Sequence, residues 1–200
     1  SVWSVAASMM MFILIMTAPL LAALSVVREK ETGSIYNIYA STIRRAEFIL
    51  GKLLPNVLIS FTNAVVLWLM AMWYFGAPFK GSIPFFLLVT LLYVLCTSSL
   101  GLLVSMLVRT QQAALMIAVI LSVIIALQFS GMLTPVALLT GSNWLLAHLL
   151  PAMYYQNVVL GAFLKGSGWA VLWPEALVLA VYSVAVLAVV VLLFRKRTRT

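Results

Sequence analysis

Long apolar runs separated by short polar stretches dominate the chain. A helix that crosses a hydrocarbon core of about 30 Å needs about 20 mostly apolar residues, whereas barrel strands give short segments that alternate between apolar and polar. Five windows satisfy the helical requirement, at about 4–27, 53–75, 83–108, 113–133 and 176–194. The pattern therefore predicts an all-α transmembrane bundle with five visible spans.

Composition agrees with a chain that folds in lipid. Hydrophobic residues make up 65% of the sequence, and the mean hydropathy is +1.18. Soluble globular chains are about 45–50% apolar, so one soluble core cannot hide this much apolar surface. We expect a multi-pass membrane protein in which residues 1–200 form a single transmembrane domain.

The positions of the basic residues predict the orientation, because short cytoplasmic loops carry an excess of Lys and Arg. One set of segments holds ten basic residues and the opposite set holds only Lys80 and Lys165. The ten are Arg28, Lys30, Arg44, Arg45, Lys52, Arg109, Arg195, Lys196, Arg197 and Arg199. This places the 28–52 segment, the Arg109 turn and the C-terminus in the cytoplasm.

The start of the chain predicts that the sequence is the C-terminal part of a longer protein. It opens "SVWSVAAS", without an initiator Met or the positively charged start of a signal peptide. Five crossings and a cytoplasmic C-terminus would put this start outside. We therefore expect at least one further span upstream, which would make six.

The formal charge of +8 does not indicate nucleic-acid binding. The basic residues follow the membrane topology, and no basic stripe with interleaved aromatic residues is present. For the tail "RKRTRT" we instead expect attraction to anionic membrane lipid.

Residues that carry catalysis are scarce. Cys96 and His148 are the single cysteine and the single histidine, and the acids are Glu29, Glu31, Glu47 and Glu175. These residues form no nucleophile and base set and no metal-ligand motif, and Gly51-Lys52 lacks the rest of a phosphate-binding loop. We therefore predict no catalytic residue, no metal site and no cofactor in this chain.

The segment 28–52 holds eight of the sixteen charged residues. Thr32 and Ser34 offer hydroxyl caps beside Gly33, and Ile35, Tyr36, Tyr39 and Ile43 recur near helical spacing. This predicts a short amphipathic helix across the membrane face, with an uncharged aromatic middle that suits a partner's groove. A solvated loop helix with no partner is the alternative that the spacing leaves open.

Two motifs carry a resemblance to a known family. "REKETGSI" follows one span, and "RRAEFILGKLL" leads into the next. Together with the later "SGMLTPVALLTGSNWLLAHLLPAMYYQNVVLGAFLKGSG", they resemble type-two ABC exporter permeases over essentially the whole chain. The resemblance implies six spans per half-transporter, a dimer with a second permease copy or a homologous half, and a separate ABC ATPase that holds ATP and magnesium.

The same resemblance implies roles for individual residues. Residues 34–43 would form the helix that meets the ATPase, within a coupling region 28–52. Its members would be Arg28, Glu29, Glu31, Gly33, Ser34, Tyr36, Tyr39 and Ile43, and the outer gate region would include Gly131, Pro135, Pro151, Gly161 and Gly166. One departure is Leu160, where many relatives have a basic residue.

The outer segment 133–168 is too broken by Pro and Gly to span and too apolar for a free loop. Such pieces are tolerated at membrane depth when they are buried against protein or line a cavity, so we expect outer re-entrant helices there.

Two polar stripes lie on predicted spans. Asn56, Ser60 and Asn63 share one helical face, which suits either a transport pathway or hydrogen bonds between helices. Small residues at four-residue steps, Thr97, Gly101 and Ser105, predict close helix packing.

These observations favour a permease subunit of an ATP-driven ABC exporter, with hydrophobic drugs, lipids and glycan precursors all open as cargo. The alternative is a membrane scaffold or signalling component that docks an ATPase without transporting anything.

Overall fold

The computed structural model describes residues 2–194, and every regular element within that range is helical. The α-helices are α1 (Val2–Glu31), α2 (Ile35–Ala40), α3 (Arg45–Trp73), α4 (Ile83–Leu107), α5 (Gln111–Ile124), α6 (Ser142–Leu149), α7 (Pro151–Leu160) and α8 (Trp169–Leu193). Two π-helical turns, η1 (Ile125–Phe129) and η3 (Gly161–Lys165), extend α5 and α7, and η2 (Val136–Leu138) is a short 3-10 helix. The basic tail expected to contact lipid lies outside the described residues.

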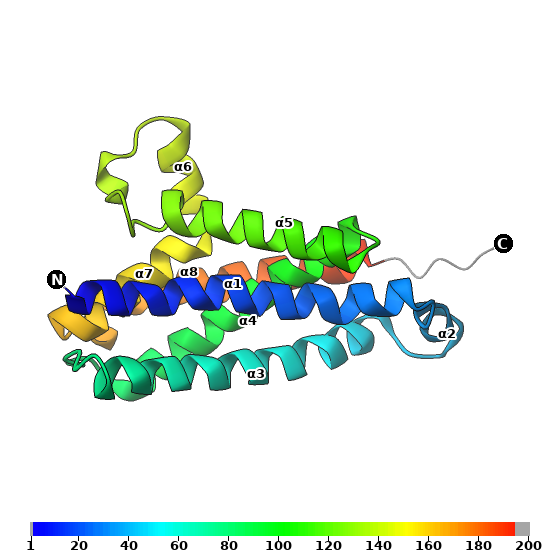
Figure 1. The fold of residues 1–200 in the computed structure, drawn as a ribbon, viewed down its shortest axis with the longest axis horizontal. Helices are drawn as coiled ribbons and strands as arrows, with labels where there is room; N and C mark the ends of the chain where they lie inside the picture. Colours follow the sequence, from blue (N-terminus) through cyan, green and yellow to red (C-terminus); the bar gives the residue numbers. More distant parts are fainter. Residues whose placement is uncertain (1, 195–200) are drawn as a thin grey trace.

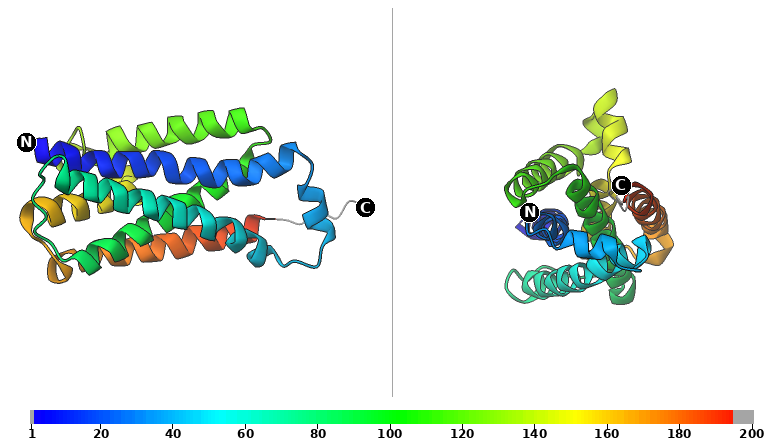
Figure 2. Two further views of the ribbon diagram at one scale, coloured as in Figure 1. Left: turned by 60° about the horizontal axis from the view of Figure 1, so that its bottom comes forward. Right: turned by 90° about the vertical axis from the view of Figure 1, so that its right-hand side faces the viewer.

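Five of these helices are long and apolar enough to cross a membrane, namely Trp3–Glu31, Arg45–Trp73, Ile83–Leu107, Gln111–Phe129 and Trp169–Leu193. The predicted all-α transmembrane bundle is thus confirmed for the part of the chain that the structure describes. They run side by side along the long axis, with the N-terminus at one end and α2 and the end of α8 at the other (Figures 1 and 2).

Two helices begin earlier than their apolar runs. Helix α3 starts at Arg45 rather than near 53, because the Glu47 carboxylate accepts a hydrogen bond from the Arg44 backbone N–H at 2.9 Å and caps the polar first turn. Helix α8 starts at Trp169 rather than near 176, so Pro174 lies inside it. Hydropathy marks the membrane core, whereas the polar cap at Glu47 lets α3 begin before it.

Helix α4 lies at the centre and packs against α1, α3 and α8. Thr97, Gly101 and Ser105 are all buried on it, and Gly101 faces Pro19 of α1. A Cβ at position 101 would lie 2.6 Å from the Pro19 Cα atom, well inside carbon contact distance. The small-residue stripe therefore packs two backbones together, as its spacing predicts.

The outer segment has two different parts. Helix α6 stands away from the bundle, and most of its residues are exposed (Figure 1). Helix α7 is buried against α1, α4 and α8, where the Tyr155 ring stacks on Tyr93 of α4 at a centroid distance of 4.0 Å. Of these two helices, only α7 has the burial expected of a re-entrant element.

Candidate functional site

The turn after α1 reverses the chain at Gly33. Its φ of +76° lies in the left-handed region, where a residue without Cβ is strongly favoured. The Thr32 hydroxyl donates a hydrogen bond back to the Arg28 carbonyl at 3.0 Å, and Ser34 makes no side-chain cap to α2. The prediction that these hydroxyls cap α2 is wrong, because Thr32 instead satisfies the open carbonyls at the end of α1.

Helix α2 is shorter than the predicted 34–43 and ends at Ala40, because Ser41 is already extended with ψ of 163°. It crosses the end of the bundle (Figure 2). Ile35 is buried, and the half-buried Tyr39 packs on Phe194 of the α8 end at 6.1 Å between ring centroids. Tyr36 is 64% exposed, so one side of α2 holds it to the bundle and the other stays open.

Ile43, expected at the end of this helix, lies in the extended connection to α3 and is 41% exposed. Arg28 is exposed on the last turn of α1. Both side chains are therefore exposed in the segments that flank α2.

Three successive charged residues at the end of α1 each bind a different helix. We call Glu29, Lys30 and Glu31 the α1 cluster. Glu29 forms an ion pair with Lys52 of α3, and Lys30 donates hydrogen bonds to the Ser105 and Val108 carbonyls at the end of α4. Glu31 accepts hydrogen bonds from the backbone N–H and side-chain amide of Gln111, the first residue of α5.

The signs of these charges match the helix ends that they meet. The last carbonyls of a helix carry partial negative charge and its first N–H groups carry partial positive charge. A lysine at the α4 carbonyls and a glutamate at the α5 N–H are therefore both favourable. Any displacement of the end of α1 must break these contacts or carry α3, α4 and α5 with it.

Sequence reasoning missed four members of this site, and they are Lys30, Lys52, Gln111 and Phe194. Lys30 and Lys52 were assigned only to the basic side of the topology. Gln111 directly follows the Arg109 turn at the start of a span, and that position could have suggested a helix N-terminus in need of an acceptor.

The predicted stripe on α3 divides into two kinds of residue. Asn56 is buried and donates hydrogen bonds to the Ser25 hydroxyl of α1 at 3.1 Å and to the Lys52 carbonyl at 2.7 Å. Ser60 is buried with no hydrogen-bond partner for its hydroxyl among the described residues, and Asn63 is partly exposed. Asn56 thus connects two helices, which is the packing alternative for that position.

Two of the expected outer gate residues, Pro151 and Gly161, lie at the two ends of α7. Pro151 and Gly161 are buried, Gly131 is partly exposed, and Pro135 and Gly166 are exposed. Pro151 is the first residue of α7, where its missing N–H costs nothing. Next to Gly161, the Ala162 carbonyl accepts hydrogen bonds from the backbone N–H groups of Lys80 and Gly81. These bonds tie the loop between α3 and α4 to the end of α7.

At the same end, the Tyr154 hydroxyl donates a hydrogen bond to the His148 carbonyl at 2.7 Å. Burial raises the pKa of the Tyr154 hydroxyl, and the nearby Glu175 carboxylate raises it further. Tyr154 therefore serves as a neutral hydrogen-bond donor. Among residues 2–194, no group of three or more His, Cys, Asp or Glu side chains is arranged to hold a metal ion.

Comparisons with known proteins agree with this architecture. Residues 1–192 match the family model described as "ABC-2 family transporter protein". The chain is 27% identical over 201 residues to the "Probable multidrug ABC transporter permease YbhR" of Escherichia coli (strain K12), covering 98% of this chain and 53% of that protein. It is 25% identical over 186 residues to the "Inner membrane transport permease YhhJ" of the same strain, covering 92% and 50%. The chain thus spans about half the length of these curated relatives.

Proposed function

The chain belongs to the ABC-2 family of transporter proteins, and on that basis we propose that it forms the membrane-spanning permease part of an ATP-driven exporter. In this proposal a separate ABC ATPase binds ATP and magnesium on the side where α2 lies. A second permease copy or a homologous half completes the transporter. The protein would lie in the bacterial inner membrane with its C-terminus in the cytoplasm, which the excess of basic residues at that end supports.

The observation that carries the proposal is the position of α2 beside the α1 cluster. Tyr36 presents an exposed aromatic side chain, while Ile35 and Tyr39 hold the helix against the bundle. The turn between α2 and α1 is only a few residues long. A partner that moves α2 would therefore move the α1 cluster, and through it the ends of α3, α4 and α5. Such a rigid link suits a transport cycle in which one side opens as the other closes.

We propose a hydrophobic cargo. An apolar cavity of 430 Å³ lies between α1 and α3, and its lining includes Met9, Met10 and Met70. Unbranched thioether side chains repack around different shapes, which suits varied apolar molecules. Two relatives carry the word "multidrug" in their names. Accumulation of a hydrophobic fluorescent dye in cells that express the full transporter, with and without ATP, tests both the cargo class and the direction.

The first experiment tests the contact with the ATPase. In the full-length protein, Tyr36→Cys should crosslink to a surface cysteine on the partner ATPase, and the yield should change when ATP binds. Tyr39→Cys is the matched control, because the same helix turns that side chain toward Phe194. Equal crosslinking of both variants, or of neither with the ATPase present and folded, would refute α2 as the docking helix.

A second experiment separates coupling from docking. Glu31→Gln weakens the link to α5, so ATP hydrolysis should continue while dye export falls. Glu47→Gln is the control, because this acid caps α3 and does not join two spans. Normal export in Glu31→Gln would remove the α1 cluster from the mechanism. Normal ATPase docking without export in the unmodified protein would instead favour the scaffold.

A further inference from the structure

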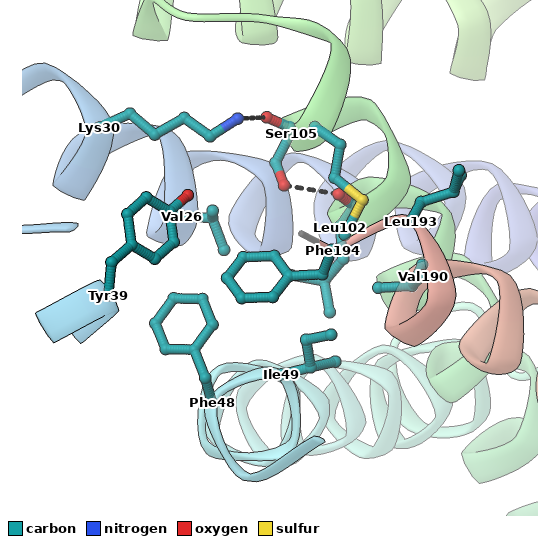
Figure 3. A pocket seen from close by; sticks show the side chains of 11 residues that line it. Val26, Lys30, Tyr39, Phe48, Ile49, Leu102, Ser105, Val190, Leu193 and Phe194 are labelled. Atoms are coloured by element: carbon teal, nitrogen blue, oxygen red, sulfur yellow. Dashed lines mark hydrogen bonds between the residues drawn. The ribbon is translucent and has the colours of Figure 1, made fainter. Parts of the chain in front are cut away.

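A cavity that the proposed transport cycle does not use lies at the α2 end of the bundle. It has a volume of 160 Å³ and is formed by residues of α1, α2, α3, α4 and the end of α8. Aromatic rings of Tyr39, Phe48 and Phe194 and aliphatic side chains that include Ile49 and Leu102 form its apolar walls, and Ser105 also lines it (Figure 3). The Phe48 and Phe194 rings stack at 5.0 Å between centroids, so this wall is well ordered by packing.

One cation borders this apolar space. Lys30 extends along the cavity, with its ammonium group at the end of α4 (Figure 3). Its two carbonyl partners, Ser105 and Val108, use two of the three N–H donors of an ammonium group. Among the described residues the third donor has no partner, so it can bind a ligand.

No carboxylate of the described residues neutralises this lysine. The ion pair of the described part of the chain joins Glu29 to Lys52, and Glu31 is held by Gln111. Arg109 is the charged group whose field acts on Lys30, and it is also positive. Lys30 at the edge of the cavity is therefore a cation without a carboxylate partner among the described residues, and Arg109 adds to the positive potential around it.

From this juxtaposition we infer that the cavity binds an anionic amphiphile, with its acidic headgroup at Lys30 and part of an acyl chain between the aromatic and aliphatic walls. The volume is close to that of engineered protein cavities of about 150 Å³ that take up benzene. It holds a short part of one chain, and the remainder of the chain extends along the lipid-facing surface. A phosphate of an anionic phospholipid and the carboxylate of a fatty acid both offer this chemistry.

An occupant of this site contacts α2 and the bundle at once, because Tyr39 comes from α2 while Phe48 and Phe194 come from α3 and the end of α8. Binding therefore stabilises the docked position of α2. The effect of the ligand on ATPase coupling rests on the proposed function, but the binding itself does not. A binding measurement without the ATPase consequently distinguishes failure of this site from failure of the transport proposal.

The test uses the full-length protein, purified and stripped of lipid, with native mass spectrometry to measure binding of dioleoylphosphatidylglycerol, dioleoylphosphatidylcholine and oleate. The anionic phospholipid should bind more tightly than the zwitterionic one. Lys30→Gln should lower the affinity for the anionic phospholipid about tenfold, because losing a hydrogen bond to a charged group costs about that factor in affinity. Lys30→Arg should retain the affinity. Arg45→Gln, an exposed charge at the same end, should change little.

Filling the cavity is the second arm. Ile49→Trp should abolish binding, whereas Ile59→Trp on the exposed face of the same helix should leave it intact. If Ile49→Trp does not fold, Leu193→Trp at the exposed rim of the same cavity replaces it. Competition by oleate would make free fatty acids ligands as well, and binding of phosphatidylglycerol alone would identify a lipid site. Equal affinity for both phospholipids, or unchanged binding in the filled cavity, would overturn the inference.

Discussion

Replacing Gly101 by Ala tests the central contact of the bundle. The added Cβ would lie 2.6 Å from the Pro19 Cα atom and closer still to the Pro19 carbonyl oxygen. Carbon atoms pack at about 3.5–4.0 Å, so α1 and α4 would have to separate by about 1 Å. Because the obstacle is backbone rather than a flexible side chain, we expect an overpacking cost near the upper end of the usual range, about 3 kcal/mol.

Helix propensity favours Ala and so offsets part of this overpacking cost, and a second glycine serves as the control for it. Ala is favoured over Gly in a helix by about 1 kcal/mol, so the net loss for Gly101→Ala is about 2 kcal/mol. Gly51 also lies inside a helix, α3, but a Cβ there meets no atom within 4 Å. Gly51→Ala should therefore gain up to about 1 kcal/mol, and the two variants should differ by about 3 kcal/mol.

A melt monitored with a thiol-reactive dye measures both variants in the same detergent. Cys96 is the single cysteine of the chain and is buried, so its labelling reports unfolding. For a chain of this size, 1 kcal/mol shifts the melting temperature by about 2–4 °C. Gly101→Ala should melt about 4–8 °C below the unmodified protein, and Gly51→Ala slightly above it. Melting of Gly101→Ala at or above the temperature of Gly51→Ala would refute the close approach of α1 and α4.

Three further predictions follow from single contacts. Tyr155→Phe should lower the free energy of unfolding by about 1 kcal/mol, because the Tyr155 hydroxyl lies 3.0 Å from the hydroxyl of a threonine on α4. Tyr93→Phe should cost nothing, because the Tyr93 hydroxyl is buried without a partner among the described residues. Thermal melts of both variants check this difference. A double-mutant cycle of Glu29→Gln and Lys52→Gln should give a coupling of about 1 kcal/mol, the upper end for partly exposed pairs, and additive effects would contradict the pairing. Gly33→Ala should cost about 1 kcal/mol through its positive φ alone, and Gly33→Asn should cost less in the same melt.

The sequence by itself determined the class of fold and the number of visible spans. Each of these properties depends on runs of about 20 apolar residues, and such a run requires a helix in lipid because its backbone groups have no other partners. The packing role of Gly101 could also be predicted, because small residues at four-residue steps lie on one face whatever the neighbouring helix is. The positive φ of Gly33 agrees with the break expected there.

Only the tertiary structure decided the partners of charged and aromatic groups. The sequence REKE predicts a cluster of charge, but it does not show that Glu29, Lys30 and Glu31 reach three different helices, since Gln111 lies 80 residues from Glu31. The same holds for Tyr39, whose contact with Phe194 depends on where α8 ends beside α2. Periodicity describes the faces of one helix, whereas these contacts depend on how separate helices are placed against one another, and that placement is a property of the whole packed bundle.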